Sequence, residues 1–139
     1  MFFTAGMDEV EDVVHQGTQD TDEGFDLTLG NVYVVEEAGR VDFGGGELEE
    51  PELTRVGTEK RNGEDDYGWW NLDAGTYVVE HNETLNTDEA VTVRTRTELL
   101  NRGAYHPTVR VAELPLLPLT VGGDGIRLKE NARVSTVVR

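Results

Sequence analysis

The sequence has 139 residues, enough for one domain with a buried core, and it contains no cysteine. Disulfide frameworks, thiolate metal sites and cysteine nucleophiles are therefore excluded. The formal charge is −16 at pH 7, from 28 acidic and 12 basic residues, which argues against nucleic-acid binding through phosphate neutralisation. No apolar stretch is long enough to span a membrane, and the first residues lack the features of a signal peptide, so we expect a cytoplasmic protein.

The acidic excess is accompanied by few lysines and by small apolar side chains. Lys60 and Lys129 are the lysines, the other basic residues are arginines, and Ile126 is the single isoleucine. These features predict a halophilic protein, because molar salt screens charges beyond about 3 Å and weakens self-repulsion. An acidic surface that binds a basic partner is the alternative interpretation.

The N-terminal region is predicted to hold one short helix. Val10, Val13 and Val14 have the i, i+3, i+4 spacing of an apolar helix face, which predicts a helix over residues 7–15 that ends at Gln16-Gly17. We expect residues 1–20 to contain this helix and a polar, acidic connector.

The remaining chain has the pattern of short strands. Residues 24–35 alternate like a strand, with Gly30-Asn31 allowing a bend or bulge. Further strands are predicted at 76–80, 90–93, 108–113 and 126–138, whereas two prolines make residues 114–119 an edge or interrupted strand. The sequence therefore predicts a single, mainly β domain over residues 1–139, with its core in residues 24–138.

Three other short patterns help to place the turns. The triple glycine at 44–46 is followed by glutamates, which predicts a flexible turn instead of a phosphate-binding loop. Asn62-Gly63 indicates a hairpin turn. In Trp69-Trp70, neighbouring strand positions face opposite ways, so one indole should enter the core and the other should face a neighbour, an interface or a stacked ligand.

Arginines are concentrated in residues 94–103. Arg94, Arg96 and Arg102 lie within these ten residues of an otherwise acidic chain. Arginine suits bidentate recognition of phosphate, so this stretch is a candidate anion site. Ion pairing with the chain's own carboxylates is the alternative, since such pairs are common on protein surfaces.

Four segments, in this order, resemble motifs of archaeal dUTPases and dCTP deaminases. They read G-F-D-L-T-L-G at 24–30, L-D-A-G-T-Y at 72–77, R-T-E-L-L-N-R-G-A at 96–104 and G-I-R-L-K-E-N-A-R-V-S at 125–135. The resemblance covers about residues 24–138. It implies a β-clip fold, which is a distorted β-barrel or jelly roll, a homotrimer with active sites between subunits, and a deoxynucleoside triphosphate as ligand.

The third motif departs from the family pattern. In the family its serine pair and arginines hold the triphosphate, which by position assigns phosphate binding to Arg96, Thr97 and Arg102. Glu98 stands where the second serine is expected, and Asn101 takes the place of the distal arginine, with Arg102 displaced by one residue. A carboxylate within about 4 Å of a phosphate oxygen costs on the order of 4 kcal/mol at an effective dielectric near 20.

The catalytic segment that follows in the family is also altered. Residues 105–115 are shorter than the family segment and lack its aspartate and its glycine pair, which leaves Glu113 as the nearby carboxylate and a weak candidate for the catalytic base. Residues 116–121 lack the glutamate of the deaminases. The histidines at 15, 81 and 106 show no metal-ligand spacing, and Ser135, the single serine, has no nucleophile-elbow motif, so we expect no metal site and no serine hydrolase.

Three functional hypotheses follow. The first is a homotrimeric, catalytically degenerate protein of deoxyribonucleotide metabolism. The second is an active dUTP or dCTP nucleotidohydrolase that releases pyrophosphate, in which Arg96, Thr97 and Arg102 bind phosphates through Mg²⁺ and Glu113 activates water. The third is an acidic interaction module unrelated to nucleotides.

Overall fold

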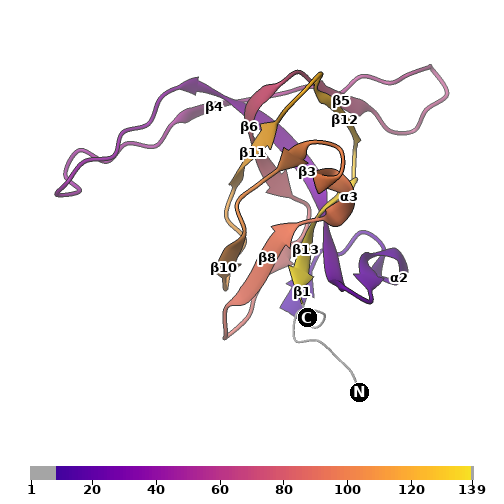
Figure 1. Cartoon of the computed structure of the whole chain (residues 1–139), viewed down its shortest axis with the longest axis horizontal. Helices are drawn as coiled ribbons and strands as arrows, with labels where there is room; N and C mark the ends of the chain where they lie inside the picture. The colour runs from indigo at the N-terminus through magenta and orange to yellow at the C-terminus, as the bar shows by residue number, and fades with distance from the viewer. Residues whose placement is uncertain (1–8, 139) are drawn as a thin grey trace.

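The computed structural model describes residues 9–138, which form a mainly β structure built on one curled antiparallel sheet (Figure 1). The path of this nine-stranded sheet is β10 (Val109–Val111), β8 (Val91–Thr95), β13 (Arg133–Val138), β3 (Gly24–Glu37), β6 (Gly75–His81), β11 (Leu117–Val121) and β9 (Ala104–Tyr105). Two further strands, β2 (Asp20–Thr21) and β4 (Glu52–Arg55), also pair with β3. The predicted all-β class is confirmed.

Two small ribbons and two one-turn helices complete the described chain. One ribbon pairs β1 (Val10–Glu11) with β7 (Thr84–Leu85), and the other pairs β5 (Trp69–Leu72) with β12 (Ile126–Lys129). The helices are α2 (Gln16–Gln19) and α3 (Thr97–Leu100). No helix within residues 9–138 has the length and apolar content needed to cross a membrane.

Strand β3 is the centre of the sheet. Its first half pairs with β13 and its second half with β6, and the pairing shifts register between Leu29 and Asn31. This irregularity confirms the bulge predicted at Gly30-Asn31. A Cβ atom at Gly30 would lie 2.7 Å from the Asn82 side-chain oxygen, so any larger residue there would force Asn82 to shift where the two chain segments approach.

The core consists of two apolar clusters that the sheet joins. Phe25 and Leu27 of β3 belong to one cluster, whereas Leu29 and Val32 of the same strand belong to the other. Trp70 is buried in the second cluster, but Trp69 is partly exposed. This confirms the prediction that the two indoles face opposite ways.

A long arm leaves the body where β3 ends. In Figure 1 it extends away from the sheet, and a bridge between Arg40 and Glu49 holds its two strands together. At its tip the Asp42 carboxylate accepts hydrogen bonds from the backbone N–H groups of Gly45 at 3.0 Å and Glu47 at 2.9 Å. The triple glycine is thus a turn, as predicted. Three large apolar side chains of the arm are exposed: Val41, Phe43 and Leu48.

The predicted N-terminal helix over residues 7–15 is wrong from Val10 onward, although Glu9 is helical. Residues 7 and 8 lie outside the described chain, Val10 pairs with Leu85 in the β1–β7 ribbon, and the helix α2 begins only at Gln16, where the predicted helix ends. Val10 is buried by this pairing and Val14 is exposed, so the three valines do not share one face. Long-range strand pairing outweighed a short helical pattern.

The C-terminal part of the chain refines two other predictions. Residues 126–138 form two strands, because Asn131 takes a left-handed conformation with φ of 68° and turns the chain between β12 and β13. Strand β11 pairs with β6 along its length, but β9 pairs only with Thr120 and Val121. Pro118 therefore has a partner strand on one side only, in β6. This confirms the prediction that the proline-containing segment is an edge strand.

Candidate functional site

The arginine-rich segment forms the end of β8, the helix α3 and the turn that follows. Arg96 is the first residue outside the helix, and its carbonyl oxygen accepts the N–H groups of Leu99 at 3.0 Å and Leu100 at 3.1 Å. Leu99 is buried and holds the helix against the core. Gly103 ends the segment with φ of 89°, a conformation that favours glycine. The charged side chains of the segment therefore project from the corner that α3 and this turn form.

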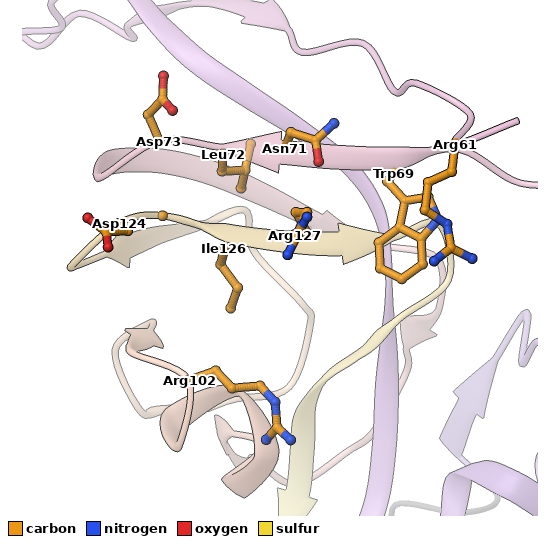
Figure 2. A pocket seen from close by; sticks show the side chains of 10 residues that line it. Arg61, Trp69, Asn71, Leu72, Asp73, Arg102, Asp124, Ile126 and Arg127 are labelled. Carbon is orange, nitrogen blue, oxygen red and sulfur yellow. The ribbon is translucent and has the colours of Figure 1, made fainter.

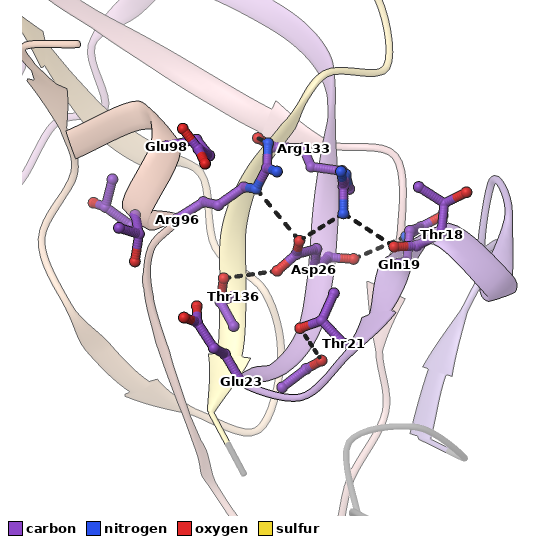
Figure 3. Close-up of polar contacts among 12 residues, drawn as sticks. Thr18, Gln19, Thr21, Glu23, Asp26, Arg96, Glu98, Arg133 and Thr136 are labelled. Carbon is purple, nitrogen blue, oxygen red and sulfur yellow. Dashed lines mark hydrogen bonds and ion pairs between the residues drawn. The ribbon is translucent and has the colours of Figure 1, made fainter. Parts of the chain in front are cut away.

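Arg96 is held by a buried carboxylate. Its Nε lies 3.4 Å from Asp26 Oδ2, and the same oxygen lies 3.2 Å from Arg133 Nη1 (Figure 3). The Thr136 hydroxyl donates to the other Asp26 oxygen at 2.8 Å. Asp26 is 4% exposed, so this carboxylate is nearly removed from water and is compensated by two guanidinium groups and a hydroxyl.

Arg94 and Arg102 are also paired, but at the surface. Arg94 Nη2 lies 3.2 Å from a Glu23 carboxylate oxygen, and Arg94 Nη1 lies 3.4 Å from the Thr97 hydroxyl. Arg102 Nη1 lies 2.7 Å from Glu98 Oε1, and the side chains of both residues are more than half exposed. All three arginines of the segment thus form ion pairs within the chain, as the alternative interpretation of this stretch expects.

A cleft of about 830 Å³ opens beside Arg102 (Figure 2). Residues from four parts of the chain line it: Arg61, Trp69, Asn71, Leu72, Asp73, Arg102, Asp124, Gly125, Ile126 and Arg127. Arg96 and Thr97 are not among these lining residues. The structure therefore separates the residues predicted to bind phosphate, since Arg102 faces a cleft and the partly exposed Arg96 pairs with the buried Asp26.

Glu113 borders a different cavity. A pocket of about 380 Å³ is lined by residues 80–85 and 113–116, which include Glu113 and His81. None of Arg96, Thr97 and Arg102 lines this pocket. Within one chain, the candidate base and the predicted phosphate-binding residues thus share neither of these two cavities.

Comparison with known proteins identifies the family. The chain is 37% identical to the probable deoxyuridine 5′-triphosphate nucleotidohydrolase of Archaeoglobus fulgidus over 136 residues, which cover 93% of this chain and 76% of the relative. It is 31% identical to the protein of the same name from Methanosarcina mazei over 133 residues, 90% of this chain and 74% of the relative. The chain belongs to the dUTPase-like superfamily. No protein-family profile matches its sequence.

Three of the segments that resemble dUTPase motifs meet at one carboxylate. Asp26 comes from the first segment, Arg96 from the third and Arg133 from the fourth, and all three are joined by the ion pairs of Figure 3. The second segment lies in the turn between β5 and β6, where the Tyr77 hydroxyl donates to the Asp73 carbonyl oxygen at 2.8 Å. In this dUTPase-like chain, the motif residues Asp26, Arg96 and Arg133 thus form a structural centre.

A second buried carboxylate supports this centre. Glu83 is 3% exposed and accepts hydrogen bonds from Thr28 N at 2.8 Å and from the Thr28 hydroxyl at 2.6 Å. The Gln19 side-chain amide donates to Glu83 at 2.8 Å and to the Asp26 carbonyl oxygen at 2.9 Å. Gln19 therefore attaches the helix α2 to the strand that carries Asp26. Sequence reasoning missed Glu83, because nothing in its neighbourhood distinguishes it from a surface glutamate.

The dUTPase-like chain also buries a pair of histidines around its single serine. The Ser135 hydroxyl lies 2.7 Å from His81 Nε2 and 2.7 Å from His106 Nε2, and His106 Nδ1 lies 2.8 Å from the Pro107 carbonyl oxygen. With both rings neutral, His106 Nδ1–H donates to that carbonyl, Ser135 donates to His106, and His81 Nε2–H donates to Ser135. His81 Nδ1 is then a buried acceptor without a partner among the described residues.

Burial sets the protonation of this pair. It lowers the pKa of His81 from 6.5 to about 4, an effect that the nearby His106 strengthens and Glu80 opposes. Burial also lowers the pKa of His106, against the hydrogen bond to Pro107. Ser135 is fully buried, so the group is a neutral structural network and not a nucleophile. The sequence separates these residues widely, and their meeting depends on the sheet topology.

Proposed function

We propose that this chain acts in deoxynucleotide metabolism as a homotrimer that binds a deoxynucleoside triphosphate but has lost the ability to hydrolyse it. Both relatives are named as nucleotidohydrolases of deoxyuridine triphosphate, which supports the metabolic role. The observation that carries the loss of hydrolysis is the pairing of the motif arginines with carboxylates of their own chain, Arg96 with Asp26 and Arg102 with Glu98.

These pairings weaken the motif as a triphosphate site in two ways. Each carboxylate already satisfies the guanidinium that the nucleotide would need, so the ligand must compete with it. Glu98 also adds a negative charge on the same helical turn, which repels a phosphate group at short range. Affinity should therefore be low, and the phosphates should not be held firmly enough for in-line attack by water.

The position of Glu113 supports the same proposal. A general base must lie within hydrogen-bond reach of the attacking water, next to the phosphate that is attacked. Glu113 is exposed and borders a pocket without arginine, whereas Arg102 borders the other cleft. An active enzyme with Glu113 as base would need a second subunit to bring the two regions together.

The arm supports the homotrimer. Phe43 and Val41 are at least nine-tenths exposed, with 108% and 90% of their reference surface accessible, and Leu48 is 62% exposed. Three large apolar side chains on one projecting arm are unusual for a surface in water and indicate a contact with another chain. When such a contact joins two different surfaces of identical subunits, repeated contacts can form a closed ring. A ring of three subunits, related by a threefold rotation axis, is a trimer.

A turnover assay tests the proposal. The protein is incubated with dUTP or dCTP and Mg²⁺ in molar KCl, and pyrophosphate release and deamination are followed. We expect no turnover above background and a nucleotide-dependent rise in melting temperature. Turnover that disappears in Glu113→Gln but persists in Glu89→Gln, a change at an exposed carboxylate outside both pockets, would overturn the proposed loss of hydrolysis.

Sedimentation in the same buffer tests the assembly. We expect the mass of three chains. A monomer at micromolar concentration would contradict the homotrimer, and with it any site shared between subunits.

A further inference from the structure

We infer that the cleft beside Arg102 binds a polyphosphate anion through Arg61, Arg102 and Arg127. This inference deepens the proposed function and rests on it, because the proposed function supplies a nucleotide as the molecule that carries the polyphosphate. It places the anion in a cleft that shares only Arg102 with the residues assigned to phosphate binding by the family motif.

Three arginines from distant parts of the chain meet at this cleft. Arg61 comes from the loop before β5, Arg102 from the turn after α3, and Arg127 from β12. Figure 2 shows Arg61 beside Trp69 on the right, Arg127 in the middle and Arg102 below, with the carboxylates of Asp73 and Asp124 on the left. In a chain of formal charge −16, such a concentration of positive charge is an electrostatic feature that an anion would recognise.

Strand alternation explains why this wall is cationic. In the β5–β12 ribbon, Arg127 lies opposite Asn71 and Lys129 lies opposite Trp69. Residues that pair across two strands share a face, so these four side chains project from one side of the ribbon. The intervening pair, Trp70 and Leu128, is buried in the core. The ribbon therefore has one apolar face and one face with Arg127 and Lys129.

The three arginines differ in how strongly they are engaged by the chain's own carboxylates. Within residues 9–138, no hydrogen bond or ion pair engages the side chain of Arg127. Arg61 Nε lies 3.9 Å from an Asp65 oxygen, which is a long contact, and the Arg102–Glu98 pair is exposed to solvent. A multiply charged anion must therefore compete with Glu98 for Arg102, which lowers its affinity, whereas it meets no such competition at Arg127.

The indole ring of Trp69 lies beside the cations of Arg61 and Lys129, so its fluorescence can serve as a signal for anion binding. Arg61 Cζ lies 4.8 Å and Lys129 Nζ 5.7 Å from the centre of the indole ring, both at cation–π distance. The indole N–H is buried and has no hydrogen-bond partner among the described residues. A bound anion that draws Arg61 or Lys129 toward itself changes the environment of the ring, so its fluorescence should change.

The chemistry of the cleft selects phosphate over a single carboxylate. Guanidinium groups bind phosphate oxygens in a bidentate way, and three of them match an anion with several charged groups in a row. The cleft volume of about 830 Å³ is large enough for a nucleotide. Inorganic triphosphate and a nucleoside triphosphate share this chemistry, and the experiment distinguishes them.

The experiment is a fluorescence titration of the full chain with inorganic triphosphate and, separately, with dUTP. We expect saturable quenching by both ligands and binding at least about tenfold weaker in Arg127→Gln, since a hydrogen bond to a charged group is lost. The matched control is Arg110→Gln, an exposed arginine outside both pockets, which should bind like the wild type. Trp69→Phe should abolish the optical signal but keep the ligand-dependent rise in melting temperature.

The outcomes separate this inference from the proposed function. Tighter binding of dUTP than of inorganic triphosphate assigns a nucleotide to the cleft, and equal binding assigns the polyphosphate chain alone. If dUTP binds equally well to the wild type and to Arg127→Gln, the inference is wrong while nucleotide binding elsewhere stands. If neither ligand quenches the fluorescence nor raises the melting temperature, both the inference and the proposed nucleotide binding are wrong.

Discussion

The carboxylate of Glu98 lies 2.7 Å from the guanidinium of Arg102, one helical turn further along the chain. This pair occupies the segment that resembles the triphosphate motif of the dUTPase-like superfamily. A serine at position 98 would donate a hydrogen bond to phosphate, whereas the glutamate offers only acceptors and a negative charge. Under the proposed function, glutamate at position 98 therefore removes a hydrogen-bond donor to phosphate and pairs with the arginine that remains.

The buried centre at Asp26 should be essential for stability. Asp26→Asn leaves Arg96 and Arg133 without their shared carboxylate, and breaking a buried ion pair costs about 3 kcal/mol or more. We expect this loss in the free energy of unfolding from denaturant titration. Glu49→Gln is the control, because it removes an exposed pair with Arg40 and should change stability by less than about 0.5 kcal/mol. Equal effects of the two changes would show that Asp26 is not a structural centre.

The buried histidine His81 should make the protein sensitive to mild acid. Its pKa is about 4 in the folded state and about 6.5 when unfolded, so the unfolded chain binds more protons between these values. Its contribution to stability is therefore complete above pH 6.5 and is lost as the pH falls toward 4. Between pH 7.5 and 4.5 this amounts to about 2 kcal/mol.

The comparison with His81→Gln isolates this effect. The many carboxylates are common to both proteins, so their titration cancels in the difference between the two pH profiles. We expect a smaller loss of unfolding free energy on acidification in His81→Gln than in the wild type. Parallel pH profiles would contradict the assignment of the effect to His81.

The arm should be needed for assembly but not for folding. Phe43 is fully exposed within one chain, so Phe43→Ser combined with Val41→Ser should leave the melting temperature of the separated chain unchanged. We expect the two substitutions to shift the sedimentation of the protein from trimer toward monomer. Tyr67→Ser, at an exposed aromatic residue outside the arm, is the control and should keep the trimer. An unchanged trimer in the double variant would remove the arm from the interface.

Local patterns in the sequence predict much of the sheet. The alternation in β3, the bulge at Gly30-Asn31 and the opposite orientations of Trp69 and Trp70 follow from backbone geometry that neighbouring residues determine. The helix expected near Val10 failed because a partner strand 75 positions away, at Leu85, outweighs a one-turn pattern.

The site depends on contacts that local patterns do not encode. The resemblance located Arg96 and Arg102, but it did not show that the first pairs with the buried Asp26 and the second faces a cleft. Arg61 and Arg127 reach that cleft from segments that carry no phosphate motif, and the pairing of β5 with β12 places Arg127 on the ribbon that also carries Trp69 and Asn71. The position of a side chain relative to distant strands is set by topology.

The affinity of Glu98→Ser for dUTP tests the central claim most directly. The substitution frees Arg102 and removes the repulsion, so binding measured by calorimetry in molar KCl should tighten by about tenfold or more relative to the wild type. The control is Glu23→Ser, which frees Arg94, a residue outside the cleft, and should leave the affinity unchanged. An affinity of Glu98→Ser equal to or weaker than that of the wild type would contradict the claim that Glu98 disables the phosphate motif.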